Sequence, residues 1–151
     1  MAFFSFRSQW QLPVEPQAAY DALADIDRYP QWWPQVRSTR RLDEHSGELV
    51  IRSALPFSLR VVATRAVQDP QALTLAATLS GDLTGHSSWQ VNATPSGCTA
   101  VFIEEVTADR LFGASSFLGR RALEWNHAAM MRSGERGLRR HLSAAGLDSN
   151  I

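Results

Sequence analysis

The stretch from Ser115 to Ala144, SSFLGRRALEWNHAAMMRSGERGLRRHLSA, has the longest helical periodicity in the chain and decides the fold. Ser115 or Ser116 suits the N-cap of this helix, and Gly146 stands just past its predicted end. At about 100° per residue, one face collects an apolar stripe made of Leu123, His127, Met130, Met131, Gly134, Leu138 and Leu142. We therefore predict one long C-terminal helix that buries this apolar stripe against the rest of the chain.

Upstream of this helix, the hydrophobic pattern has a period of two, which is typical of β-strands. Six strands are predicted there, at Val36–Leu42, Glu48–Ser53, Ser58–Val67, Ala72–Ser80, Thr84–Thr94 and Thr99–Thr107. Turn signals such as Ser46-Gly47, Asp69-Pro70 and Gly81-Asp82 separate them. No segment between the strands is long enough for a crossover helix, so the strands are expected to be antiparallel.

One further strand and two short helices precede these six strands. Phe4–Leu12 alternates apolar and polar residues and predicts a strand. VEPQAAYDALAD, residues 14–25, predicts a short helix with Pro16 in its first turn. DIDRYPQWW, residues 25–33, predicts a second short helix or helical turn that stops before Pro34. The chain is thus predicted to form one α+β domain, residues 1–151, in which a curved seven-stranded antiparallel sheet wraps around the long helix.

Composition narrows the classes of partner and cofactor. The chain has 151 residues, of which 44% are apolar and 20% charged, as in globular proteins. Its cations are all arginines, and they balance the carboxylates to a net charge of zero, which disfavours nucleic acid as the main partner. The absence of lysine excludes Schiff-base catalysis and a P-loop lysine. Cys98 is the single cysteine, which excludes an intrachain disulfide and a multi-cysteine metal site.

Other sequence signals predict a cytoplasmic protein without a cofactor. No apolar run approaches the roughly 20 residues that span a bilayer, so stable membrane insertion is not expected. The first residues, MAFFSFRSQW, lack the long apolar region of a signal peptide. The four histidines show no metal-ligand spacing, and no G-x-G-x-x-G follows a strand, so neither a metal nor a dinucleotide is predicted.

Four stretches together resemble the START-like helix-grip superfamily, also called SRPBCC, and within it the polyketide cyclase/dehydrase-type members. They are VEPQAAYDALADIDRYPQWWPQV at residues 14–36, LPFSLRV at 55–61, GDLTGHSSWQV at 81–91 and NHAAMMRSGERGLRRHL at 126–142. The resemblance covers nearly the whole chain. It implies a helix-grip fold, with a deep cavity between the sheet and the long helix. Members of this superfamily bind sterols, lipids, polyketides or other hydrophobic molecules, and some of them are cyclases while others are carriers.

Residues of the apolar stripe and of the aromatic segments are the predicted ligand contacts. Trp32 and Trp33 suit a lid at the cavity mouth, or else anchor the short helices on the sheet. His127 is a ligand contact, a general acid or base, or a packed histidine satisfied by a backbone carbonyl or by Asn126. The predicted ligand-binding residues are Trp32, Trp33, Leu55, Phe57, Trp89, Leu123, His127, Met130 and Met131, and no catalytic residue is assigned.

Two further features of the helix indicate what surrounds it: a glycine in its interior and a second apolar strip. Gly134 costs about 1 kcal/mol in a helix interior, so either a strand passes close by or a cavity needs the space. A second apolar strip is made of Leu118, Ala122, Trp125 and Ala129. The loop Leu111-Phe112-Gly113 is one candidate to cover that strip, and a homodimer contact through Trp125 is the other.

Binding is the predicted function: a carrier or sensor for a hydrophobic or amphipathic small molecule such as a lipid or polyketide. The alternative is a polyketide cyclase/aromatase or dehydratase, in which His127 and an Arg or Glu move protons at an enolisable carbon. A third possibility is a partner-binding domain with a filled core. An enzyme needs two convergent polar groups, and the stripe offers one, which favours binding. Arg52 and Glu104 are expected in solvated ion pairs, but either one would orient a ligand carboxylate or hydroxyl if it pointed inward.

Overall fold

The computed structural model describes residues 2–52, 57–108 and 116–148, and of residues 145–148 it describes the backbone alone. Seven strands form one antiparallel sheet: β1 Phe3–Leu12, β2 Val36–Arg41, β3 Ser46–Ile51, β4 Leu59–Asp69, β5 Thr74–Gly81, β6 Thr84–Thr94 and β7 Gly97–Thr107. Between β1 and β2 lie the helix α1, Pro16–Ala24, and the 3₁₀ helix η1, Ile26–Gln31. The long helix α2, Phe117–Asp148, follows the sheet. The predicted α+β architecture is confirmed.

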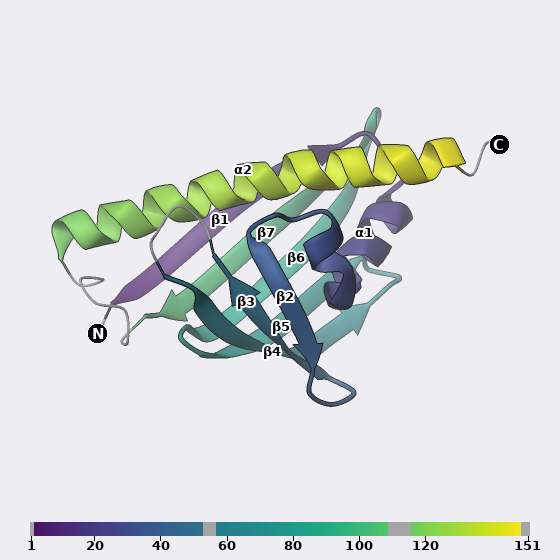
Figure 1. Cartoon of the computed structure of the whole chain (residues 1–151). Coiled ribbons are helices and arrows are strands. Elements are labelled where there is room, and N and C mark those ends of the chain that lie inside the picture. The colour runs from purple at the N-terminus through teal and green to yellow at the C-terminus, as the bar shows by residue number, and fades with distance from the viewer. Residues whose placement is uncertain (1, 53–56, 109–115, 149–151) are drawn as a thin grey trace.

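The order of strands in the sheet is β1-β7-β6-β5-β4-β3-β2. The first two strands of the chain therefore lie at opposite edges, and α1 and η1 bridge the distance between them. Figure 1 shows α2 lying across one face of the curved sheet, with α1 and η1 on the same side. None of the helices in the described part of the chain is both long and apolar enough to cross a membrane.

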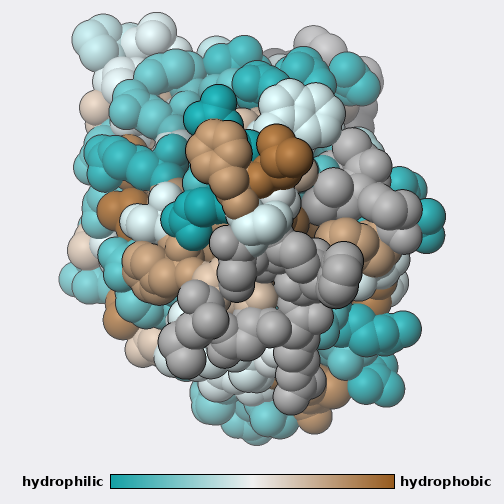
Figure 2. All heavy atoms as spheres, turned by 90° about the vertical axis from the view of Figure 1, so that its left-hand side faces the viewer, coloured by the Kyte–Doolittle hydropathy of each residue, from teal (hydrophilic) through white to brown (hydrophobic). Residues whose placement is uncertain are grey.

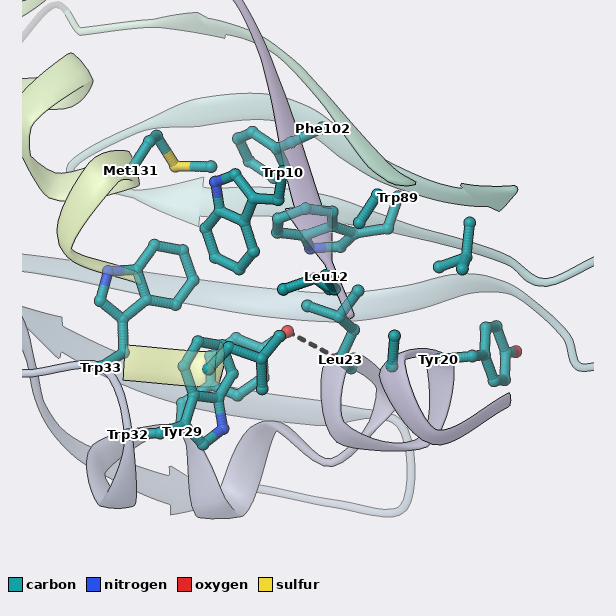
Figure 3. Close-up of a cluster of buried hydrophobic side chains, with 14 of the residues drawn as sticks. Trp10, Leu12, Tyr20, Leu23, Tyr29, Trp32, Trp33, Trp89, Phe102 and Met131 are labelled. Carbon is teal, nitrogen blue, oxygen red and sulfur yellow. Dashed lines mark hydrogen bonds between the residues drawn. The ribbon is translucent and has the colours of Figure 1, made fainter. Parts of the chain in front are cut away.

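The apolar stripe of α2 faces the sheet, as predicted. Met131, Gly134 and Leu138 are buried, whereas positions on the opposite face, such as Arg132 and Arg136, are exposed. The buried residues of this stripe pack near an aromatic cluster made of Trp10, Tyr29, Trp32, Trp33 and Trp89 (Figure 3). Ring centroids in this cluster are 4.8 Å apart for Trp10 and Trp89 and 5.3 Å apart for Trp10 and Trp33. Contacts between aromatic rings at such separations add stability beyond the area they bury.

Gly134 is explained by indole packing. A Cβ at Gly134 would stand 2.6 Å from Cε2 of Trp33 and 2.8 Å from the Trp10 ring. Trp33 also donates a hydrogen bond from Nε1 to the Met130 carbonyl, at 3.0 Å. Thus the space left by the missing side chain is taken up by two indoles, and not by a strand backbone or a ligand. Through this packing, α2 contacts β1 and the segment after η1.

The edge of the sheet at β1 is held to the second half of α2. The backbone N–H of Gln11 donates to the Glu135 carboxylate at 2.7 Å, and its carbonyl accepts from Nε of Arg139 at 2.6 Å. Glu135 and Arg139 form an ion pair with each other at 3.6 Å. These contacts satisfy backbone groups that an edge strand would otherwise expose to strands of other molecules.

The N-terminal end of α2 agrees with the prediction, and its C-terminal end does not. Of the two candidate caps, Ser116 takes the role, since its Oγ accepts the Gly119 N–H at 3.0 Å. The predicted stop at Gly146 is wrong, because α2 continues through it to Asp148. A single glycine lowers helix stability by about 1 kcal/mol and does not by itself end a helix. Strand ends fall within about two residues of the predicted ones.

Gly134→Ala is expected to destabilise the protein by about 1–3 kcal/mol, because the added Cβ meets two rigid indole rings. Helix propensity alone predicts the opposite sign, a gain of about 1 kcal/mol. Urea denaturation measures the difference. The control is Arg132→Ala at an exposed position of the same helix, where a change within about 0.5 kcal/mol is expected. A more stable Gly134→Ala protein would contradict the packing argument.

Candidate functional site

A cavity of about 200 Å³ lies between α2 and the sheet. Its sheet wall is made of residues of the six strands β2 to β7, among them Val36, Leu49, Val61, Leu75, Trp89 and Phe102. Met130 and Met131 supply the helix wall, and Trp33 and Tyr29 close one side. Figure 3 shows Met131, Trp33, Trp89 and Phe102 converging from separate elements. The interior is therefore mostly apolar and aromatic, which is typical of small-molecule sites.

Polar residues gather where the cavity approaches η1 and the turn between β2 and β3. Asp25, Asp27, Arg41 and the segment 43–47 belong to the wall there. Nη2 of Arg41 lies 2.8 Å from the Asp27 carboxylate, and both side chains are substantially exposed to water. This part of the wall therefore forms the mouth of the cavity, and the ion pair ties η1 to β2 across it.

The predicted ligand contacts separate into two groups. Trp33, Trp89, Met130 and Met131 line the cavity. The others that the structure describes do not belong to its wall. Trp32 is buried behind Trp33, with ring centroids 5.3 Å apart, and Phe57 is exposed. Leu55 lies outside the described residues.

Leu123 and His127 lie nearer the start of α2 than Met130 and Met131, and they do not belong to the cavity wall. Leu123 packs on a small separate cluster that includes Phe4 and Val106. The His127 ring stacks on Phe6, with centroids 3.8 Å apart and an interplanar angle of 9°. The stripe from Leu123 to Leu142 is about 28 Å long at 1.5 Å per residue, far longer than a cavity of this volume. Only the turn at Met130 and Met131 reaches it.

Glu104 is the buried carboxyl of the cavity wall. It lies on β7 between Phe102 and Val106, which point to the same face of the sheet, and the side chain is only 12% exposed. Its register neighbours are Ser87 on β6 and Phe6 on β1. It is not in a solvated ion pair, contrary to the expectation from sequence. The alternation Cys98, Ala100, Phe102, Glu104, Val106 was the signal that this carboxyl points inward.

His127 is the close polar neighbour of Glu104. Its Nε2 lies 3.7 Å from Oε1 of Glu104, and its side chain is 11% exposed. That separation is too long for a hydrogen bond. Nε2 of His127 has no hydrogen-bond partner among the described residues. Thus no backbone carbonyl accepts a hydrogen bond from Nε2 of His127, and this buried nitrogen remains able to form one.

Burial moves the pKa values of this pair in opposite directions. Desolvation raises the pKa of Glu104 to about 7, and it lowers the pKa of His127 to about 4. Both shifts favour the neutral form of the group, because a charge loses its hydration in an apolar site. At neutral pH the imidazole is thus uncharged, and both the protonated and the ionised forms of the carboxyl are accessible. The two groups form a buried pair that can donate and accept protons beside the cavity, and not a salt bridge.

No side-chain cluster suited to a metal ion occurs among the described residues, taking groups of three or more His, Cys, Asp or Glu. The described residues of the cavity wall likewise include no glycine-rich turn leading into a helix, as a phosphate site would require. The chemistry available at the site is hence apolar contact, aromatic contact and hydrogen bonding or proton transfer at Glu104.

Comparisons with known proteins agree with this architecture. Residues 4–143 match the family model described as "Polyketide cyclase / dehydrase and lipid transport". No curated protein matches the chain. Similar solved structures include the Zhui aromatase/cyclase of a Streptomyces species, with 12% identity, a TM-score of 0.75, and coverage of 92% of this chain and 93% of that one. At that identity the likeness shows the fold.

Two further structures extend the comparison. A protein from Thermus thermophilus has 16% identity and a TM-score of 0.73, over 93% of this chain and 99% of its own. A START superfamily protein from Mycobacterium smegmatis has 12% identity and a TM-score of 0.70, over 96% of this chain and 99% of its own. These structures share the helix-grip fold of this chain. The family match over residues 4–143 assigns the chain itself: it belongs to the polyketide cyclase/dehydrase and lipid transport family.

Proposed function

We propose that the protein binds a small hydrophobic or amphipathic molecule, as a carrier or sensor, in the cavity between α2 and the sheet. The observation that carries this proposal is an apolar cavity of about 200 Å³ with one buried carboxyl, Glu104, in its wall. The apolar body of the ligand would contact Trp33, Trp89, Met130 and Met131. Its polar end would meet Glu104.

The volume of the cavity favours a compact ligand. An apolar cavity of about 150 Å³ accommodates benzene, and pockets for drug-sized molecules begin near 300 Å³. At about 200 Å³, the cavity suits one or two fused rings or a short chain. Met130 and Met131 have unbranched, adaptable side chains, so this part of the wall can adjust to the shape of the ligand.

Glu104 favours a ligand that carries a carbonyl or hydroxyl group. The protonated carboxyl donates a hydrogen bond, and the ionised form accepts one. A pure hydrocarbon would leave this buried group unpaired, which weakens binding. Lipids and polyketides both combine an apolar body with such oxygens, in line with the description of the family.

A cyclase/aromatase or dehydratase activity is the second candidate, and the Glu104–His127 pair favours it. A general base works best when its pKa lies near the working pH, and the pKa of Glu104 is raised to about 7. In a dehydration, the Glu104 carboxylate would take the proton from a carbon next to a carbonyl. The resulting acid would return that proton to the departing hydroxyl, which leaves as water. The His127 ring lies beside Glu104, with Nε2 3.7 Å from Oε1, and would shield the carboxyl from water.

Met131→Trp tests the binding proposal. If the cavity holds the ligand, the larger ring fills it, and binding of 2-naphthol measured by calorimetry should weaken at least about tenfold, or ~1.4 kcal/mol. Stability should change little. In a close-packed core the same substitution would cost about 1–3 kcal/mol. Ala128→Trp, on the exposed side of α2, is the control and should bind 2-naphthol as the wild type does. Uptake by Met131→Trp equal to that of the wild type would overturn the proposed site.

The Glu104–His127 pair also has a signature in stability. Since the pKa of Glu104 rises from 4.5 to about 7 on folding, its contribution to the free energy of unfolding falls as pH increases between these values. The pKa of His127 drops from 6.5 to about 4, so its contribution grows as pH increases from 4 to 6.5. In the wild-type protein the two contributions largely offset each other.

Single substitutions should separate these contributions. Relative to wild type, the free energy of unfolding of Glu104→Gln should rise by up to about 3 kcal/mol from pH 4.5 to 7. That of His127→Gln should fall by a similar amount between pH 4 and 6.5. Urea denaturation at steps of pH measures both slopes. If the free energy of unfolding depended on pH in the same way in the wild type, Glu104→Gln and His127→Gln, neither group would be desolvated. This result would remove the basis of the proposed enzyme activity.

A further inference from the structure

The face of α2 that points away from the sheet carries large apolar side chains. Leu118 is 79% exposed, Phe117 74% and Trp125 60%. Figure 2, which views the molecule from the end where α2 begins, shows apolar side chains at the surface of that end. Leu118, Ala122 and Trp125 of the second apolar strip are thus exposed. Leu111-Phe112-Gly113, one of the two candidates to cover this strip, lies outside the described residues.

Arginines continue the same face along the helix. Arg121, Arg132, Arg136 and Arg140 are exposed, and none forms an ion pair within the described part of the chain. At about 100° per residue they lie within roughly 60° of Trp125 around the helix axis. The two glutamates in the described part of α2 lie off this face and pair with other arginines, Glu124 with Arg120 and Glu135 with Arg139.

The outward face, defined by Leu118, Arg121, Trp125, Arg132, Arg136 and Arg140, therefore combines exposed apolar groups with unneutralised positive charge. It contains no carboxylate over about 33 Å of helix. Tryptophan is favoured at the boundary between lipid headgroups and acyl chains, and arginine is attracted to anionic headgroups. We propose that this face docks α2 along the surface of an anionic lipid bilayer, without insertion of the helix across it.

Charge favours a bilayer over a second copy of the chain as the occupant. In a symmetric dimer the same face meets itself, so the arginines of one copy would approach those of the other. Such like charges oppose association unless anions lie between them. An anionic bilayer satisfies both parts of the face at once, because its headgroups neutralise the arginines and its interface accepts the indole and the leucine side chain. The proposal does not depend on the ligand or on the chemistry of the cavity.

Co-sedimentation with vesicles tests the docking. The wild-type protein should bind vesicles in which roughly one third of the phosphatidylcholine is replaced by phosphatidylglycerol, and it should bind pure phosphatidylcholine at least about tenfold more weakly. Leu118→Ser combined with Trp125→Ser should lower the binding to the anionic vesicles about tenfold. Arg132→Gln combined with Arg136→Gln should lower it by a similar factor and reduce its sensitivity to salt.

Two variants elsewhere serve as matched controls. Val67→Ser removes an exposed apolar side chain from β4, and Arg37→Gln removes an exposed arginine from β2. Both should bind anionic vesicles as the wild type does, and circular dichroism checks that every variant is folded. Equal binding to the two kinds of vesicle, no binding to either, or equal losses in the controls would overturn the proposal. So would a stable dimer in gel filtration that Trp125→Ser separates into monomers.

Discussion

The packing of Trp33 against the backbone of α2 at Gly134 is the contact on which the rest of the structure depends. The indole lies where a side chain of α2 would otherwise stand, and its Nε1 donates to the Met130 carbonyl at 3.0 Å. Trp10 of β1 fills the other side of the same glycine. One small residue thereby lets an edge strand and the segment after η1 both reach the long helix. Because indoles are large and rigid, the position of α2 over the sheet follows closely from theirs.

The same packing determines where empty space remains. The aromatic cluster fills the region under the second half of α2, and Phe6 with His127 fills the region nearer its start. Between them the facing residues are Met130 and Met131, opposite small or slender side chains such as Ala63, Ala77 and Ser87. The cavity of about 200 Å³ lies at this place. Its size is thus a consequence of which helix turn faces which strands.

Glu104 and His127 give this apolar space its polar character. Both groups are buried, and desolvation pushes both toward their neutral forms, with pKa values of about 7 and about 4. A neutral carboxyl in a cavity wall suits recognition of a ligand oxygen, and the same carboxyl with a pKa near 7 suits proton transfer. The proposed binding and the alternative catalytic activity would therefore use the same atoms. The two would differ in whether the bound molecule presents an acidic carbon to Glu104.

Periodicity in the sequence determined the seven strands, the three helical segments and the inward stripe of α2, because each of these depends on residues that are neighbours in the chain. It also placed Met130 and Met131 toward the interior. Only the tertiary structure decided which inward residues meet a void: Leu123 and His127 share the stripe but pack on Phe4 and Phe6, at another level of the sheet. The inward turn of Glu104 was visible in the alternation of β7, yet its burial depends on α2, which comes later in the chain and packs across the sheet. Periodicity gives the direction of a side chain, whereas volume and desolvation arise from contacts between distant segments.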